Sequence, residues 1–199
     1  MTESTDPDLW FPTEPAPVVP VPASEVSRLR GKRVVTGHAK HGWRYDLRAD
    51  DAVDNNGAQL VPVLLEADYY RAEIDQVEVF APLIPMDRVW IEEVADATPS
   101  TPTAAPTPTD LLSRLVTLDA PPSRPPVPAR DVLGLAGRRV VVVSPATARR
   151  DLRATTEPYQ NPDGTICVRI CDEPDWYRWA FTGQPAPGTE VPVYLIWAE

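Results

Sequence analysis

The chain has 199 residues with 29 acidic and 19 basic side chains, which gives a formal net charge of −10 at pH 7. An acidic surface repels phosphate, so this charge disfavours broad binding to nucleic acid or to anionic membranes. Two cysteines are too few for a disulfide framework, and no apolar run approaches the roughly 20 residues of a membrane span. The composition therefore favours a reduced protein that does not cross a membrane.

The start of the sequence lacks a basic segment followed by an apolar stretch, which is the pattern of a secretory signal. We therefore expect a cytoplasmic protein. Only Lys32 and Lys40 among the 19 basic residues are lysines, and 25 residues are prolines. This bias toward arginine and proline is typical of a high-GC genome, so we expect an actinobacterium or one of its phages as the source.

Residues 1–23 are rich in proline, carry acidic but no basic side chains, and show no hydrophobic period. We interpret them as a disordered, polyproline-like tail. The run Asp-Pro-Asp-Leu-Trp-Phe-Pro at 6–12 resembles a segment near the start of WhiB-like actinobacterial regulators. Those regulators hold an iron–sulfur cluster on four cysteines, which this chain lacks. The resemblance therefore implies no cluster, only a peptide with Trp10 and Phe11 that contacts a transcription partner; the alternative is that both aromatics fold back onto the chain.

Residues 24–93 are predicted to form a first small β domain. Strands are indicated by β-branched runs and by alternating apolar residues, among them Val61, Val63 and Leu65. The expected strands cover Arg33–His38 and residues 43–49, 61–65 and 89–91. Asn-Asn-Gly at 55–57 is typical of a tight turn. Residues 66–70 are expected to supply another tight turn and the start of a further strand.

Residues 94–129 again combine proline with Ser, Thr and Ala, which predicts a semi-rigid spacer. Within this linker, leucines recur near helical spacing behind a Thr109 or Asp110 cap. These are Leu111, Leu112, Leu115 and Leu118. They predict a short helix over 109–118, which either packs on one of the domains or docks a partner.

Residues 130–199 repeat the first domain, and internal repeats decide the architecture of a chain. Leu-Arg-Gly-Lys-Arg-Val-Val at 29–35 returns as Leu-Ala-Gly-Arg-Arg-Val-Val at 135–141, and Asp-Leu-Arg-Ala at 46–49 returns at 151–154. Glu-Ala-Asp-Tyr-Tyr-Arg at 66–71 returns as Glu-Pro-Asp-Trp-Tyr-Arg at 173–178. The expected strands of this copy cover 138–143, 150–154, 166–170 and 194–197, with buried Ile166, Val168 and Ile170.

Five short strands in each copy favour a small, strongly bent sheet or a barrel, because closure removes exposed edges. Tyr-Tyr-Arg-Ala at 69–72 and Trp-Tyr-Arg-Trp at 176–179 resemble the strand that Tudor-like and SH3-like barrels often place after an acidic turn. The resemblance implies the barrel class and carries over no binding residue. The predicted fold is therefore mainly β: a tandem duplication of a small five-stranded SH3-like barrel, joined by a Pro-rich linker with one short helix.

Candidate metal and thiol chemistry is sparse. His38 and His41 are the two histidines, and zinc would need at least one further ligand, so we expect loop histidines and no metal. If Cys167 and Cys171 lie on one strand, their Cα atoms are roughly 13 Å apart, too far for a disulfide. We expect both to be small apolar strand residues.

Two carboxylate pairs recur in the copies, Glu66 with Asp68 and Glu173 with Asp175. Paired carboxylates can serve general acid–base catalysis when they face a cleft. Their place in a predicted turn, beside Arg71 and Arg178, favours turn capping or ion pairing instead. We expect no enzyme and no cofactor.

Duplication without duplicated catalytic groups favours a non-enzymatic protein-binding or scaffolding module, in which tandem domains raise avidity. The candidate binding residues are Tyr69, Tyr70, Arg71, Trp176, Tyr177, Arg178, Trp10 and Phe11. Two alternatives remain. Nucleic acid could bind the aromatic face of the second copy through Arg138, Arg139, Arg149, Arg150 and Arg153, or the chain could be a structural component of a phage particle.

Overall fold

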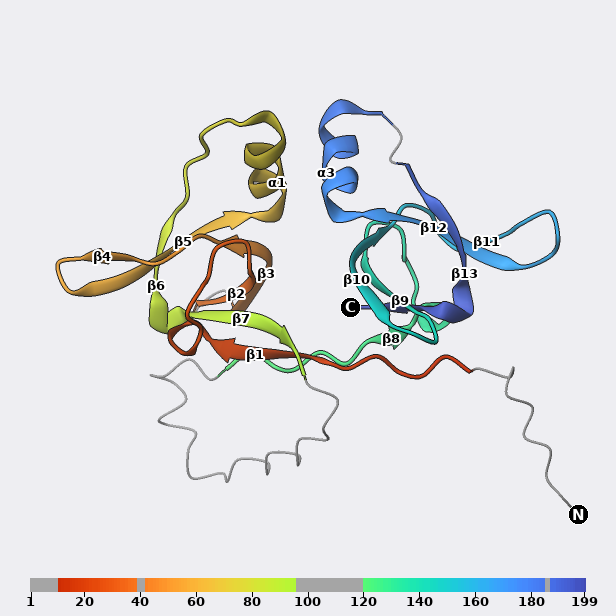
Figure 1. The fold of residues 1–199 in the computed structure, drawn as a ribbon, viewed down its shortest axis with the longest axis horizontal. Coiled ribbons are helices and arrows are strands. Elements are labelled where there is room, and N and C mark those ends of the chain that lie inside the picture. Colours follow the sequence, from red (N-terminus) through yellow and green to blue (C-terminus); the bar gives the residue numbers. More distant parts are fainter. Residues whose placement is uncertain (1–10, 39–41, 96–119, 185–186) are drawn as a thin grey trace, which may run out of the picture. The chain divides into compact units, whose positions relative to one another are not determined.

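The computed structural model describes residues 11–38, 42–95, 120–184 and 187–199. The chain divides into two compact units, which Figure 1 shows as ribbons. The first unit spans Ala16–Arg124, and the second unit combines Pro125–Glu199 with the start of the chain as far as Pro15. Each unit is mainly β, with an antiparallel sheet and a ten-residue helix, as expected for the fold class.

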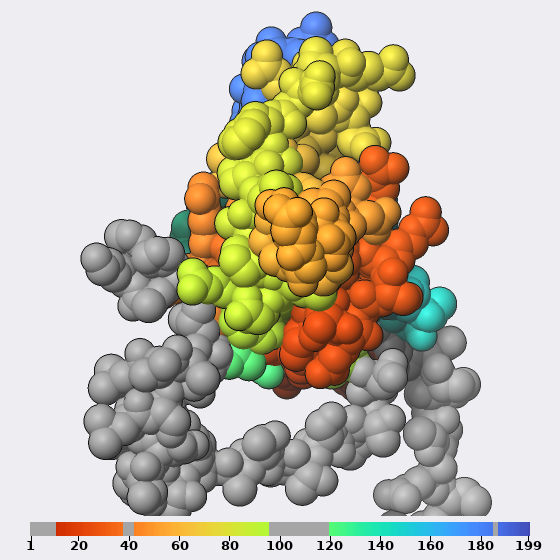
Figure 2. Space-filling model, turned by 90° about the vertical axis from the view of Figure 1, so that its left-hand side faces the viewer, coloured from red at the N-terminus to blue at the C-terminus, as the bar shows by residue number. Residues whose placement is uncertain are grey.

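The sheet of the first unit has seven strands in the path β1-β7-β2-β3-β5-β4, with β6 pairing on β5. Its strands are β1 (Val18–Pro22), β2 (Arg33–His38), β3 (Gly42–Ala49), β4 (Val53–Asn55), β5 (Ala58–Leu65), β6 (Leu83–Pro85) and β7 (Val89–Val94). Helix α1 (Glu66–Asp75) follows β5. Figure 2 shows the segment between α1 and β6, in yellow-green, running beside the orange β4–β5 hairpin.

The second unit follows the equivalent path β8-β14-β9-β10-β12-β11, with β13 pairing on β12. Its strands are β8 (Val127–Pro128), β9 (Arg139–Val143), β10 (Ala148–Ala154), β11 (Tyr159–Gln160), β12 (Ile166–Asp172), β13 (Thr189–Pro192) and β14 (Ile196–Ala198). Helix α3 (Glu173–Thr182) follows β12, as α1 follows β5. The two antiparallel sheets are therefore similar in strand order and in the place of the helix.

The count and closure of the strands differ from expectation. Each sheet has seven strands rather than five. Among the described residues no strand pairing joins β1 to β4, so the sheet of the first unit is a half-barrel rather than the closed barrel expected. Tyr194, expected in the last strand, lies in a 3-10 turn before β14.

Equivalent apolar residues form the two cores. The cluster of the first unit contains Ala23, Leu29, Val34, Leu47, Ala49, Val61, Val63, Val89 and Ile91. That of the second unit contains Ala129, Leu135, Val140, Leu152, Ala154, Val168, Ile170, Ile196 and Ala198. The expected alternation on β5 and β12 is correct for four residues and wrong for two. Leu65 and Ile166 are 41% and 45% exposed because they lie at the ends of their strands.

The residue types at the Asn-Asn-Gly turn correctly predicted its conformation. Asn56 and Gly57 have φ values of 55° and 85°, the two positive angles of a type I′ hairpin, and they join β4 to β5. Asp46 and Asp151 also have positive φ, at 57° and 58°. Each lies where the register of the neighbouring strand pair shifts, so both units bend the same strand at the same residue.

The prediction for residues 66–70 and 173–177 was wrong, since both segments begin helices rather than a turn and a strand. Two acidic side chains in the first turn of each helix interact favourably with the positive end of the helix dipole. Each helix ends at a residue in the left-handed region, Gln76 in α1 and Gly183 in α3.

The boundaries of the tail and linker also need correction. Residues 18–22, assigned to a disordered tail, form β1, which pairs with β7. On its other edge the backbone N–H of Val18 donates to Arg124 and that of Arg124 donates to Val18. Pro20 and Pro22 have the same parity as Val18, so their missing N–H groups would face this outer edge, where proline is tolerated. The assigned linker ends in β8, while the predicted helix over 109–118 lies outside the described residues.

Candidate functional site

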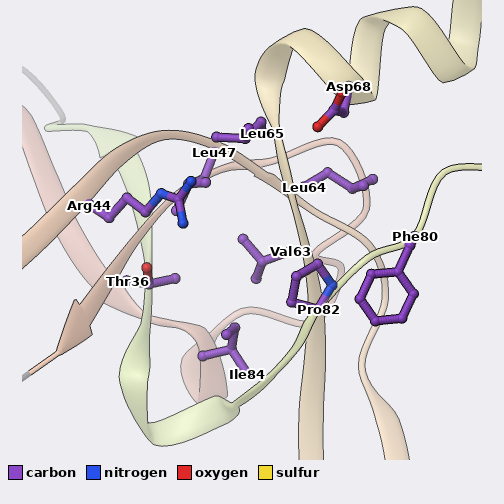
Figure 3. Close-up of a pocket in the computed structure, with 10 residues that line it drawn as sticks. All are labelled: Thr36, Arg44, Leu47, Val63, Leu64, Leu65, Asp68, Phe80, Pro82 and Ile84. Carbon is purple, nitrogen blue, oxygen red and sulfur yellow. The ribbon is translucent and has the colours of Figure 1, made fainter.

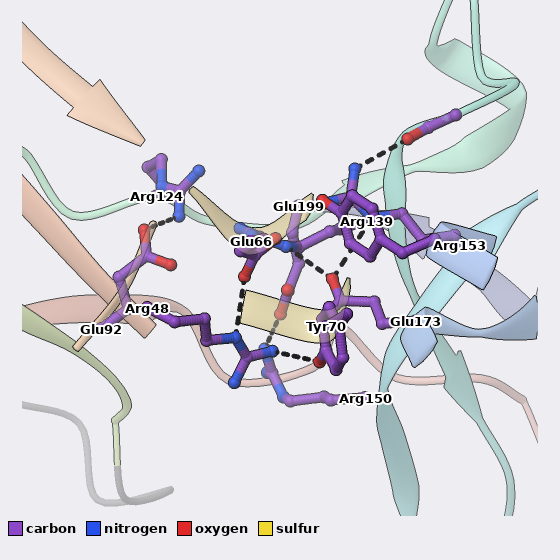
Figure 4. A network of polar contacts seen from close by, with 12 residues as sticks. Arg48, Glu66, Tyr70, Glu92, Arg124, Arg139, Arg150, Arg153, Glu173 and Glu199 are labelled. Carbon is purple, nitrogen blue, oxygen red and sulfur yellow. Dashed lines mark hydrogen bonds and ion pairs between the residues drawn. The ribbon is translucent and has the colours of Figure 1, made fainter. Parts of the chain in front are cut away.

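A buried arginine joins the helix of the first unit to its sheet. Arg48, on β3, donates from Nε to Glu66 Oε1 at 3.0 Å, from Nη1 to the Gly31 carbonyl at 2.8 Å, and from Nη2 to the Tyr70 hydroxyl at 2.8 Å. Figure 4 shows the contacts to Glu66 and Tyr70 as dashed lines. Arg48 is 8% exposed and Glu66 is 1% exposed. Removing a charge from water costs free energy, and the contacts that Arg48 and Glu66 make offset this cost.

The second unit has the equivalent arrangement. Arg153 donates to the Gly137 carbonyl and to the Tyr177 hydroxyl, both at 2.8 Å, and its Nε lies 3.3 Å from Glu173. Arg139 also donates to Glu173, at 2.7 Å. In both units, residues of the most clearly repeated motifs therefore form a buried network of ion pairs and hydrogen bonds. Glu66 and Glu173 consequently lie in no open cleft where they could exchange protons with a substrate.

The predicted aromatic and arginine candidates divide by their surroundings. Tyr70 and Tyr177 accept hydrogen bonds from the buried arginines. Tyr69 packs edge-on against Tyr70 and Trp176 against Trp179, with ring centroids 5.4 and 4.8 Å apart.

The two arginines of these segments are exposed on α1 and α3. Arg71 lies 3.8 Å from Asp75, and Arg178 lies 3.5 Å from Asp175. Exposed pairs of this kind contribute little to stability. The six candidates thus do not form one exposed aromatic face in either unit.

Trp10 lies outside the described residues, whereas Phe11 is described and is 71% exposed. With Pro12 it lines a pocket of about 520 Å³ in the second unit, against Tyr194 and Trp197. Phe11 and Pro12, at the described end of the tail, thus lie beside residues of the second unit.

The arginines of the nucleic-acid alternative are mostly paired. The ion pairs are Arg139–Glu173, Arg153–Glu173, Arg149–Asp172 and Arg150–Glu199. Arg138 is exposed and donates to the carbonyls of Gly134 and Leu133. Carboxylate partners cancel the charge that a phosphate would require, so these contacts do not favour nucleic-acid binding.

The structure gives no new reason to expect metal or thiol chemistry. Among the described residues, no group of three or more His, Cys, Asp and Glu side chains could hold a metal ion; His41 lies outside them. Cys167 and Cys171 are free, buried and both on β12, as expected. Burial raises the pKa of the Cys171 thiol to about 11 and also raises that of Cys167, so neither is a ready thiolate near neutral pH.

A surface groove that the sequence did not reveal occurs at the same place in both units. In the first unit it has a volume of about 200 Å³ and lies between β2, β3, β5 and the β6 segment (Figure 3). In the second unit it measures about 130 Å³. Nine equivalent pairs line the two grooves: Thr36 and Val142, Arg44 and Arg149, Leu47 and Leu152, Val63 and Ile170, Leu64 and Cys171, Leu65 and Asp172, Phe80 and Pro187, Pro82 and Thr189, and Ile84 and Val191.

Each groove combines an apolar floor with an exposed arginine at its edge. Leu47 and Val63 are at most 5% exposed, whereas Arg44 is exposed; Leu152, Ile170 and Arg149 repeat this arrangement. The only sequence signal for the groove is the arginine on the second strand of each copy. The arginine does not reveal the groove by itself, because residues of another strand, paired in the folded sheet, complete it. An apolar floor beside a cation can hold a side chain of another protein and orient it.

Comparison with known proteins gave no relative: no family model, no curated protein and no solved structure matches the chain. Within the described residues, none of the helices has the length and apolar character needed to cross a membrane.

Proposed function

We propose that the chain is a non-enzymatic protein-binding or scaffolding module made of two similar β domains related to SH3-like barrels, of which the first is only a half-barrel. The observation that carries this proposal is the groove at the equivalent position of each unit, with an apolar floor and an exposed arginine. The volumes, about 200 and 130 Å³, are smaller than the roughly 300–1,000 Å³ of small-molecule sites. They suit single side chains of a bound polypeptide.

The burial of Glu66, Glu173 and Cys171 supports the same proposal. Glu66 and Glu173, the strongest candidates for acid–base chemistry, lie in buried ion pairs. Burial raises the pKa of Cys171 and makes it a poor nucleophile. The groove thus offers contact surface rather than reacting groups.

Affinity capture tests this proposal. The full chain is immobilised and exposed to nuclease-treated actinobacterial lysate, and retained proteins are quantified by mass spectrometry. Arg44→Gln and Arg149→Gln each remove the charge at one groove, and Arg28→Gln removes an exposed charge elsewhere as a control. We expect specific proteins to be retained by the chain and by the control and to be reduced by at least one groove variant.

Two results would overturn the proposal. Retention that is equal for all variants would show that the grooves are not the binding surface. Recovery only from lysate that still contains nucleic acid would favour the nucleic-acid alternative.

A further inference from the structure

The two grooves share their floor but differ at their rim. Leu65 and Phe80 line the groove of the first unit and are 41% and 87% exposed. Asp172 and Pro187 hold the equivalent positions in the second unit. Large apolar side chains grouped on a surface mark sites of interaction. The second unit, with the same fold, shows that the fold itself does not require them there.

The arginines differ in the same way. In the second unit Arg149 Nη2 donates to Asp172 Oδ1 at 2.6 Å. In the first unit Leu65 replaces this aspartate, and Arg44 has no ion-pair partner among the described residues. Asp68 is the one acidic residue among those that line the groove of the first unit, and it lies across the groove from Arg44 (Figure 3).

The second unit therefore shows what an arginine at this position holds, namely a carboxylate. We propose that the groove of the first unit binds a partner peptide in which a large apolar side chain stands next to an acidic one. The carboxylate occupies on Arg44 the place that Asp172 occupies on Arg149, and the apolar side chain enters between Val63 and Phe80. This inference rests on the proposed protein-binding function and assigns it to one unit.

The charges that line the groove favour one orientation of the bound peptide. Asp68 repels a second acidic side chain at the end of the groove remote from Arg44. The net charge of −10 also repels uniformly acidic peptides. The groove thus selects a single carboxylate at the Arg44 end, followed by the apolar residue and by a neutral or basic one.

The probe is a phage-displayed library of random 12-residue peptides, selected on the full chain. The most enriched peptide is labelled with fluorescein, and its affinity is measured by fluorescence polarisation and its stoichiometry by calorimetry. We expect enriched sequences to share an acidic residue beside a large apolar one, and one peptide to bind per chain.

Three variants decide the role of the groove. Arg44 is exposed, and an exposed ion pair contributes at most about 1 kcal/mol, so Arg44→Gln should weaken binding up to roughly fivefold. Leu65→Asp supplies the carboxylate of the second unit and should weaken binding to a similar extent, while Asp is favoured at this helix N-cap, so that the variant folds. Arg28→Gln, at an exposed position away from the groove, should bind as the unchanged chain does.

The inference is overturned if the peptides lack the acidic residue, if Leu65→Asp binds normally, or if two peptides bind per chain. It is also overturned if no peptide is enriched. In that case, capture from lysate that depends on either groove arginine would still support the proposed function, so the two failures can be told apart.

Discussion

The buried pair of Arg48 and Glu66 makes a quantitative prediction about stability. Glu66→Gln removes the counter-charge of a guanidinium group that is 8% exposed. Breaking a buried ion pair by removing one partner costs about 3–5 kcal/mol. Arg48 keeps its hydrogen bonds to the Gly31 carbonyl and the Tyr70 hydroxyl, which places the expected loss near the lower limit, about 3 kcal/mol.

The same helix supplies a matched control. Asp75→Asn makes the same chemical change in the exposed pair with Arg71, where both side chains are more than half exposed, and should cost less than about 1 kcal/mol. Urea unfolding followed by circular dichroism measures both variants, fitted with two transitions if the units unfold separately. For a unit of this size, a loss of 3 kcal/mol corresponds to a fall in Tm of about 12–24 °C. If Glu66→Gln costs no more than Asp75→Asn, the buried network does not stabilise the first unit and the reasoning fails.

Three further predictions concern other parts of the molecule. Deleting residues 1–22 removes β1, including Val18, which is 5% exposed; urea unfolding should show a loss of at least about 2 kcal/mol, whereas deleting residues 1–10 should leave stability unchanged, and equal effects would contradict the strand assignment. Burial raises the pKa of Cys171 to about 11, so at pH 7.5 iodoacetamide should label it only once urea unfolds the chain, as mass spectrometry would show; rapid labelling of the folded chain would refute this. A hydrogen bond donated by Tyr159 lowers the pKa of Glu190, so this carboxylate stabilises the fold above its unfolded-state pKa and the contribution is lost as pH falls through the lower folded value. Tyr159→Phe should raise the Glu190 pKa in an NMR titration, and an unchanged value would contradict the role of this bond.

Local sequence signals predicted most of the strands. Arg33–His38 was expected with the bounds observed for β2, because a β-branched run follows a glycine. The Asn-Asn-Gly turn before β5 was also correct, since its positive φ angles are a property of these residue types. Features that depend on a few neighbouring residues can thus be inferred from the sequence.

The helices show how a local signal can be misjudged. The segment Tyr-Tyr-Arg-Ala at 69–72 suggested a strand because it resembles the strand that Tudor-like and SH3-like barrels often place after an acidic turn. Helical signals were present, however: Glu66 and Asp68 suit a first turn, and Pro174 lies at the start of α3. The prolines of β1 led to the opposite error, in which a strand was taken for a disordered tail. Proline is excluded from central strands but not from an edge strand.

The groove could not be predicted from the sequence, because it is formed by residues that are distant in the sequence and meet only in the folded sheet. Arg44 and Arg149 occupy equivalent places on their strands, and nothing near either one shows whether a carboxylate will lie beside it. The partner of Arg149 comes from β12, 23 residues away. The arginines of the second copy looked like a basic face for the same reason, since their acidic partners are remote in the sequence.

The hydrogen bonds between Val18 and Arg124 change how the chain should be divided for experiments. The first unit begins at Ala16 and ends at Arg124, and its two ends are neighbours, while the residues before and after it belong to the second unit. This is the connectivity of an inserted domain, for which adjacent ends make excision feasible. A fragment of residues 16–124 contains both partners of this contact, whereas a fragment of residues 24–93 lacks β1 and exposes the edge of β7. Deletion of residues 16–124, with residue 15 joined directly to residue 125, would retain all the strands of the second unit on one uninterrupted chain.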